Sequence, residues 1–147
     1  MNITIVTGEK ASGKSKYLTK LITSDFDGVI TNCTDRKLKK YEFNLIAKEL
    51  KLICCYYEVN KGMNFNKGNF ILVNDYLMNM LKSNKLNNII IDELGWLELK
   101  EKGFYTSVVK ILKNTNIQNL YLSLRYDIYK ELINKFDIID YKLINLS

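Results

Sequence analysis

Short, largely apolar runs alternate along this chain with longer segments in which apolar residues recur at helical spacing. Short strands are predicted at 3–7, 29–31, 70–73, 89–93, 120–124 and 141–146. Helices are predicted over 14–24, 101–114 and 127–136, and a further helix after 73 would be capped by Asn74 or Asp75. Strands and helices in alternation predict an α/β fold with a mainly parallel central sheet flanked by helices.

The segment from 33 to 60 fits two interpretations. Leu38, Tyr41 and Leu45 have helical spacing, whereas 42–46 and 50–57 are rich in residues that favour strands. We favour a β-hairpin over 41–59, inserted after the second strand. The next ten residues contain two glycines and four asparagines, and they predict a polar loop over 60–69.

Length and composition limit the class of protein. A chain of 147 residues with 47% apolar and 26% charged residues is typical of one globular domain, predicted to span 1–147. No apolar run approaches the roughly 20 residues that cross a bilayer, and no leader-like segment opens the chain. We therefore expect a cytoplasmic protein that does not associate with a membrane. Three cysteines without metal-binding spacing predict reduced thiols. The absence of histidine excludes every mechanism with a histidine base.

The net charge of +6 suits a polyphosphate ligand. It would also suit nucleic acid, but the basic residues are scattered and nearly all are lysines. The densest cluster, 36–40, is typical of a solvated loop. Nucleic acid is therefore the minor hypothesis for a partner, behind a nucleoside triphosphate.

A glycine-rich pattern of the Walker A type directly follows the first predicted strand. It comprises Gly8, Glu9, Lys10, Ala11, Ser12, Gly13, Lys14 and Ser15, and Lys16 continues into the predicted helix. Such a loop lets backbone N–H groups converge on phosphate oxygens, which the positive end of the following helix also attracts. We expect Lys14 to reach the β- and γ-phosphates and the Ser15 hydroxyl to bind Mg²⁺.

Two carboxylates follow the most apolar run of the chain. Asp92 ends the run 89–91, at the edge where open α/β sheets bind ligands, and it is the natural second ligand of Mg²⁺ beside Ser15. Glu93 is then placed to activate water next to the γ-phosphate. Taken alone, Asp92 would be a strand-terminal cap and Glu93 an exposed loop acid.

Arginine is scarce, which bears on the reaction class. Arg125 follows the run 120–124 and is a candidate catalytic contact to the γ-phosphate, with pairing to Asp127 as the alternative; Ser123 is a candidate polar sensor. Besides Arg125 the chain has only Arg36. Transfer of phosphate between two nucleotides generally needs several arginines, so their shortage argues against a nucleotide kinase.

These motifs resemble the small bacterial and archaeal nucleoside-triphosphatases grouped with the cancer-related nucleoside-triphosphatase family. The resemblance rests on 7–15 and on 90–99, in which Asp92, Glu93, Gly95 and Glu98 match the family's second motif. It implies a P-loop NTPase fold of the additional-strand type, Mg²⁺ as cofactor, and hydrolysis of ATP, GTP and other triphosphates at a slow rate. Ala11 stands where such loops commonly have glycine, and no role for Glu98 follows from the sequence.

Three functions remain open at this point. The favoured one is Mg²⁺-dependent hydrolysis of nucleoside triphosphates with broad base specificity. The alternatives are a small nucleotide or metabolite kinase of the P-loop class, and a nucleotide-dependent binding module with little turnover.

Overall fold

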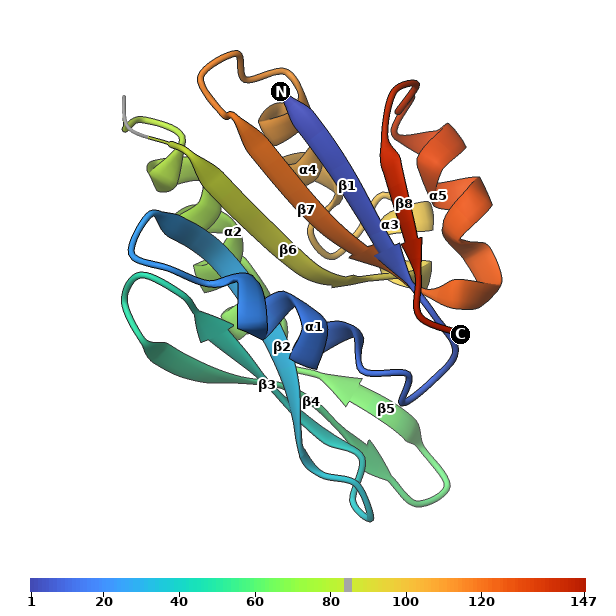
Figure 1. Cartoon of the computed structure of the whole chain (residues 1–147). Coiled ribbons are helices and arrows are strands. Elements are labelled where there is room, and N and C mark those ends of the chain that lie inside the picture. The colour runs from blue at the N-terminus through green and yellow to red at the C-terminus, as the bar shows by residue number, and fades with distance from the viewer. Residues whose placement is uncertain (84–85) are drawn as a thin grey trace.

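A computed structural model describes residues 1–83 and 86–147 and contains one sheet of eight strands in the order β5-β4-β3-β2-β6-β7-β1-β8 (Figure 1). The strands are β1 (Asn2–Thr7), β2 (Phe26–Asp35), β3 (Lys40–Leu45), β4 (Leu50–Glu58), β5 (Gly62–Phe65), β6 (Asn88–Leu94), β7 (Asn119–Leu124) and β8 (Lys142–Asn145). The helices are α1 (Lys14–Leu21), α2 (Lys67–Met80), α3 (Trp96–Leu99), α4 (Tyr105–Leu112) and α5 (Tyr129–Lys135), with a 3₁₀ turn η1 (Tyr126–Ile128) before α5.

The half of the sheet formed by β2, β6, β7, β1 and β8 is parallel, which confirms the predicted class. Strand β7 lies between β1, which leads into the glycine-rich loop, and β6, which carries Asp92. This intervening strand is the feature expected of an additional-strand P-loop fold. The run Ile89–Ile91 in β6 is fully buried, as a central parallel strand covered on both faces requires.

The other half is antiparallel. Strands β3 and β4 form the predicted hairpin over 41–59, and β3 pairs with β2. Strand β5 extends this half further, although the sequence predicted a loop there. The turns 36–39 and 59–61 therefore project past the edge of the sheet at which the glycine-rich loop lies (Figure 1).

The two faces of the sheet are covered differently. On one face α1 packs Leu18 against Val6 and Ile30 in a small core cluster. On the other face α2, α4 and α5 contribute to the main core, in which Val73, Leu77, Val108, Ile111 and Leu132 are buried. The core cluster to which a buried strand residue belongs therefore shows the face of the sheet on which its side chain lies.

The predicted strand at 70–73 is wrong, because these residues lie inside α2. The helix begins eight or nine residues earlier than expected, because its N-cap is Asn66 rather than Asn74 or Asp75. The Asn66 side chain accepts from the backbone N–H of Asn69. The local run of phenylalanine, isoleucine, leucine and valine favours a strand, but packing of Val73 against the sheet from the neighbouring layer selects the helix.

The other predicted elements are present with different bounds. The four strands β1, β2, β6 and β7 are longer than predicted, whereas β8 and the helices are shorter. Helix α1 ends at Leu21, the segment predicted as one helix over 101–114 contains α4 alone, and the last predicted helix is η1 followed by α5. Within the described residues, no helix is both long enough and apolar enough to cross a membrane.

Candidate functional site

The glycine-rich loop connects the end of β1 to the start of α1 at the carboxyl edge of the parallel strands. Gly13, the N-cap of α1, has φ 92°, a left-handed conformation that glycine adopts without steric cost. Ala11 has φ 62°, which costs a residue with a Cβ roughly 1–2 kcal/mol. The loop therefore has the backbone shape that its glycine pattern predicts, with local strain at the position where alanine replaces the common glycine.

Contacts with the rest of the chain hold this loop in place. The Lys14 Nζ donates to the carbonyl oxygen of Gly8 at 3.0 Å, so the lysine folds back over the loop. The backbone N–H of Glu9 donates to the Ser147 hydroxyl at 2.6 Å, and the backbone N–H of Leu146 donates to the Thr7 carbonyl at 2.9 Å. Five further residues were predicted to contact phosphate. Four of them are exposed, namely Glu9, Lys10, Ala11 and Lys16, and Ser12 is half-buried.

Ser15 and Asp92, 77 residues apart in sequence, meet at this edge. The Ser15 Oγ donates to Asp92 Oδ2 at 2.6 Å. Thr31 on β2 supports both residues, since its backbone N–H donates to Asp92 Oδ2 at 3.0 Å and its carbonyl accepts from Ser15 Oγ at 3.0 Å. The structure thus brings together the two residues predicted to bind metal.

The surroundings of Asp92 suit a hard cation. Asp92 is completely buried, and burial raises the pKa of its carboxyl, against the hydrogen bonds from Ser123, Ser15 and Thr31. A buried carboxylate with only neutral hydroxyl and amide partners lacks a compensating positive charge. Hydroxyl and carboxylate oxygens are the ligands that Mg²⁺ takes in proteins, so Ser15 and Asp92 fit the predicted cofactor.

Glu93 has an unusual backbone conformation within β6. Its φ is 62°, and its backbone N–H donates to the Ser123 Oγ at 2.7 Å, while the same hydroxyl donates to Asp92 Oδ1. The residue is exposed to water. Even so, burial of its carboxyl by the surrounding protein and the charge of Asp92 raise its pKa to about 7, against the opposing charges of Lys14 and Arg125. Glu93 therefore combines access to water with a pKa near neutrality, as a general base requires.

Arg125 follows β7 at the same edge, as predicted. Its backbone N–H donates to the Leu94 carbonyl at 2.9 Å, and its Nε is 2.8 Å from Asp127 Oδ1. The side chains of both partners are more than half exposed, so this ion pair contributes little to stability. Ser123, the predicted sensor, donates to Asp92 Oδ1 and accepts from the backbone N–H of Glu93.

Glu98, for which the sequence suggested no role, is a buried structural residue. Its Oε1 accepts from the Gly95 backbone N–H at 2.7 Å, and its Oε2 accepts from the Phe104 backbone N–H at 2.9 Å. It thereby caps α3 and ties the segment after Glu93 to the start of α4. Trp96, two residues before Glu98, is 48% exposed.

Replacement of Glu98 by alanine is expected to lower the free energy of unfolding by about 2–4 kcal/mol, because two buried backbone donors lose their acceptor. Urea unfolding followed by circular dichroism measures the change. Glu101→Ala is the matched control, since that exposed residue only pairs with Lys135 at the surface. Equal unfolding midpoints for the two variants would contradict the structural role of Glu98.

Two buried hydroxyls at this edge have no hydrogen-bond partner within 1–83 and 86–147. They are the Oγ of Ser12 in the loop and the Oγ1 of Thr31 on β2. A buried hydroxyl without a partner costs roughly 1–3 kcal/mol. Sequence reasoning missed Thr31, because no motif marks it and only the sheet brings it to Ser15 and Asp92.

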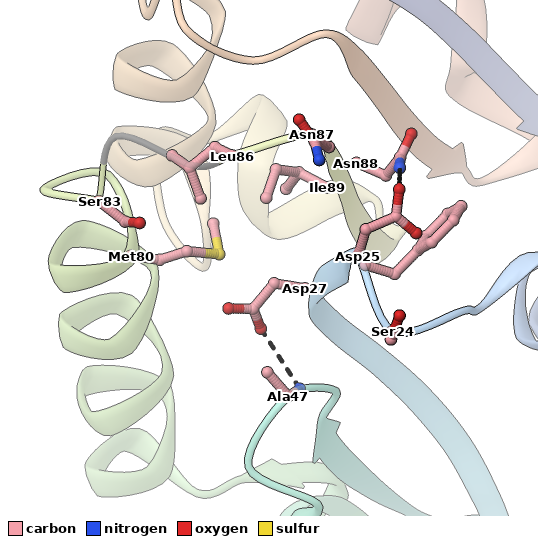
Figure 2. Close-up of a pocket in the computed structure, with 11 residues that line it drawn as sticks. Ser24, Asp25, Asp27, Ala47, Met80, Ser83, Leu86, Asn87, Asn88 and Ile89 are labelled. Carbon is pink, nitrogen blue, oxygen red and sulfur yellow. Dashed lines mark hydrogen bonds between the residues drawn. The ribbon is translucent and has the colours of Figure 1, made fainter.

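A cavity of about 200 Å³ lies at the opposite edge of the sheet, where β2 and β6 begin (Figure 2). Its acidic groups are already engaged, since Asp25 Oδ2 accepts from Asn88 Nδ2 at 2.8 Å and Asp27 Oδ1 accepts from the Ala47 backbone N–H at 3.4 Å. It faces away from Asp92 and Glu93, so the two carboxylates and the glycine-rich loop define the candidate site on their own.

Solved structures share this architecture. THEP1 from the hyperthermophile Aquifex aeolicus has a TM-score of 0.72 at 22% identity, covering 99% of this chain and 90% of its own. A human cancer-related nucleoside triphosphatase has a TM-score of 0.66 at 15% identity, covering 99% of this chain and 88% of its own. At these identities the likeness shows the fold, a P-loop NTPase fold, and the search of curated proteins gives no match.

The family comparison reaches further. A family model described as NTPase matches residues 3–146, which includes the glycine-rich loop, Asp92, Glu93 and Arg125. The match spans nearly the whole chain and agrees with the resemblance inferred from the two motifs. This chain belongs to the NTPase family.

Proposed function

We propose that the protein hydrolyses nucleoside 5′-triphosphates to the diphosphate and phosphate, with Mg²⁺ as cofactor. The observation that carries the proposal is the 2.6 Å contact between Ser15 Oγ and Asp92 Oδ2, with Glu93 next in sequence. In this proposal, one edge of the sheet carries a loop for phosphate, two oxygens for the metal, and a carboxylate that is accessible to water. These are the parts that phosphoryl transfer to water requires.

Each part has a physical task. The backbone N–H groups at the start of α1 and the Lys14 ammonium bind the phosphate oxygens, so Lys14 exchanges the Gly8 carbonyl for substrate. Ser15 and Asp92 would hold Mg²⁺, which when bound neutralises charge on the β- and γ-phosphates. Glu93 orients a water molecule toward the γ-phosphate and accepts its proton.

Arg125 contributes to catalysis in this proposal by contacting the γ-phosphate. The exposed pair with Asp127 is weak, so a phosphate competes for the guanidinium at small cost. Residues 134–137 read Asn-Lys-Phe-Asp, the pattern of a guanine-recognition motif. They stand where α5 ends and the chain returns to the start of β8, at the edge of the sheet opposite the glycine-rich loop, which supports broad base specificity. The strain at Ala11 and the presence of only two arginines in the chain, Arg36 and Arg125, favour slow turnover.

Lys14→Ala is expected to raise KM for each triphosphate by about tenfold to a hundredfold, because a charge-assisted hydrogen bond to phosphate is worth roughly 1.5–3 kcal/mol. A phosphate-release assay over ATP, GTP, CTP and UTP, with and without Mg²⁺, measures the effect. Lys20→Ala, an exposed lysine in the last turn of α1, is the matched control. Phosphate release that is equal in Lys14→Ala and Lys20→Ala would contradict the proposed site.

The same assay tests the other functions. Faster transfer of phosphate to an added hydroxyl acceptor than to water would identify a kinase instead. Tight nucleotide binding without release of phosphate would identify a binding module.

A further inference from the structure

We propose that Thr31 is a positioning residue for hydrolysis, whose hydroxyl donates a hydrogen bond to the Glu93 carboxylate and directs it toward the attacking water. This inference rests on the proposed function and adds a residue that neither motif contains. Thr31 contacts no substrate in this arrangement and acts through Glu93.

The first observation is the place of Thr31 in the sheet. Its backbone N–H and carbonyl bond Asp92 and Ser15, so the residue is fixed directly beside the two proposed metal ligands. The parallel register pairs Val29 with Ile91. Two residues further along these adjacent strands stand Thr31 on β2 and Glu93 on β6.

The second observation is the face on which the Thr31 side chain lies. Successive strand residues alternate between faces. Val29 belongs to the main core under α2, α4 and α5, whereas Ile30 belongs to the cluster under α1. Thr31 therefore returns to the main-core side, in agreement with its cross-strand partner Phe43, which is also part of that core.

The Glu93 carboxyl is near the same side. Its charge acts on Tyr41 and Cys55, raising the pKa of Tyr41 after the larger effect of burial. Both residues border the main core, and they are paired across β3 and β4. Regular pairing of β6 with β2 ends at Ile91, two residues before Glu93, which has a positive φ.

The third observation is that Thr31 is 6% exposed and its Oγ1 has no partner within the described ranges 1–83 and 86–147. A buried hydroxyl carries a desolvation penalty, and most such groups are hydrogen-bonded. Valine or isoleucine would fill this position without that penalty, as at Val29 and Ile30. Glu93 follows the last paired residue of the adjacent strand β6 by two positions, as Thr31 does on β2, so a hydrogen bond to the Glu93 carboxylate would explain why a hydroxyl is present.

The test is the pair Thr31→Val and Thr31→Ser. Thr31→Val removes the hydroxyl and keeps the branched shape, and we expect kcat to fall about tenfold or more, with KM for the Mg²⁺–nucleotide unchanged. Thr31→Ser keeps the hydroxyl and should retain most of kcat. In a Glu93→Gln background, Thr31→Val should cause little further loss, because residues that act together are not additive.

Stability separates positioning from a merely structural role. A hydrogen bond to the exposed Glu93 carboxylate adds little to stability, whereas valine removes the cost of burying a hydroxyl. The unfolding midpoint of Thr31→Val in urea should therefore equal or exceed that of the wild type while kcat falls. If the wild type hydrolyses triphosphates and Thr31→Val has the same kcat, the inference is overturned. It is also overturned if Thr31→Ser loses as much kcat as Thr31→Val. Absence of hydrolysis by the wild type would overturn the proposed function instead.

Discussion

Gly28→Ala is expected to prevent the chain from folding. Gly28 lies in β2 opposite Ile90 in β6, with φ 116°, and an added Cβ would overlap the Ile90 carbonyl oxygen and stand 2.9 Å from the Ile90 nitrogen. Backbone at the centre of the sheet cannot move aside without separating β2 from β6. We expect a loss of at least about 4–5 kcal/mol, which is comparable to the whole stability of many domains.

The soluble yield of the variant and its urea unfolding curve measure this effect. Gly62→Ala is the matched control, because Gly62 also has a positive φ, of 83°, but an added Cβ would meet nothing within 4 Å. It should cost only the strain of a left-handed alanine, roughly 1–2 kcal/mol. If both variants unfold at the same urea concentration, the close approach of β2 and β6 at Gly28 does not determine stability.

Glu93→Gln is expected to lower the rate of phosphate release by about 10²–10⁴-fold, the usual contribution of a general base. The amide keeps the size of the side chain but accepts no proton from water. Since Lys14, Ser15 and the loop N–H groups are intact, nucleotide affinity should stay within a few-fold of the wild type. Single-turnover release of phosphate and equilibrium nucleotide binding, measured on the same samples, separate the two effects.

Glu101→Gln is the control for this substitution, because it makes the same chemical change at an exposed acid whose partner is Lys135. Its release rate should match that of the wild type. If Glu93→Gln also keeps the wild-type rate, another group activates water and Glu93 has no part in the step.

The sequence predicted the site better than it predicted the elements around it. The glycine-rich loop and the pair Asp92-Glu93 are short motifs, each with a local backbone geometry, and the structure places both at one edge. The part of α2 at 70–73 was mistaken for a strand because its four residues are all apolar and show no helical spacing. It buries Val73 but leaves Ile71 and Leu72 exposed at 62% and 54%.

Other features depend on contacts between distant segments, which a single sequence does not reveal. Thr31 is an ordinary strand residue until β2 is placed beside β6. Glu98 resembles a surface acid until its carboxylate is found bonded to two buried backbone N–H groups. Strand β5 was taken for a loop because its four residues contain glycine and asparagine, and pairing with β4 is what makes it a strand.

The two outermost strands, β5 and β8, are only four residues long. An edge strand presents unpaired backbone N–H and C=O groups, and long free edges recruit strands from other chains into aggregates. Here each side of an eight-stranded sheet offers only a short row of such groups. We therefore expect the protein to stay dispersed at high concentration, even though Tyr57, Met63 and Phe65 near one edge are partly exposed.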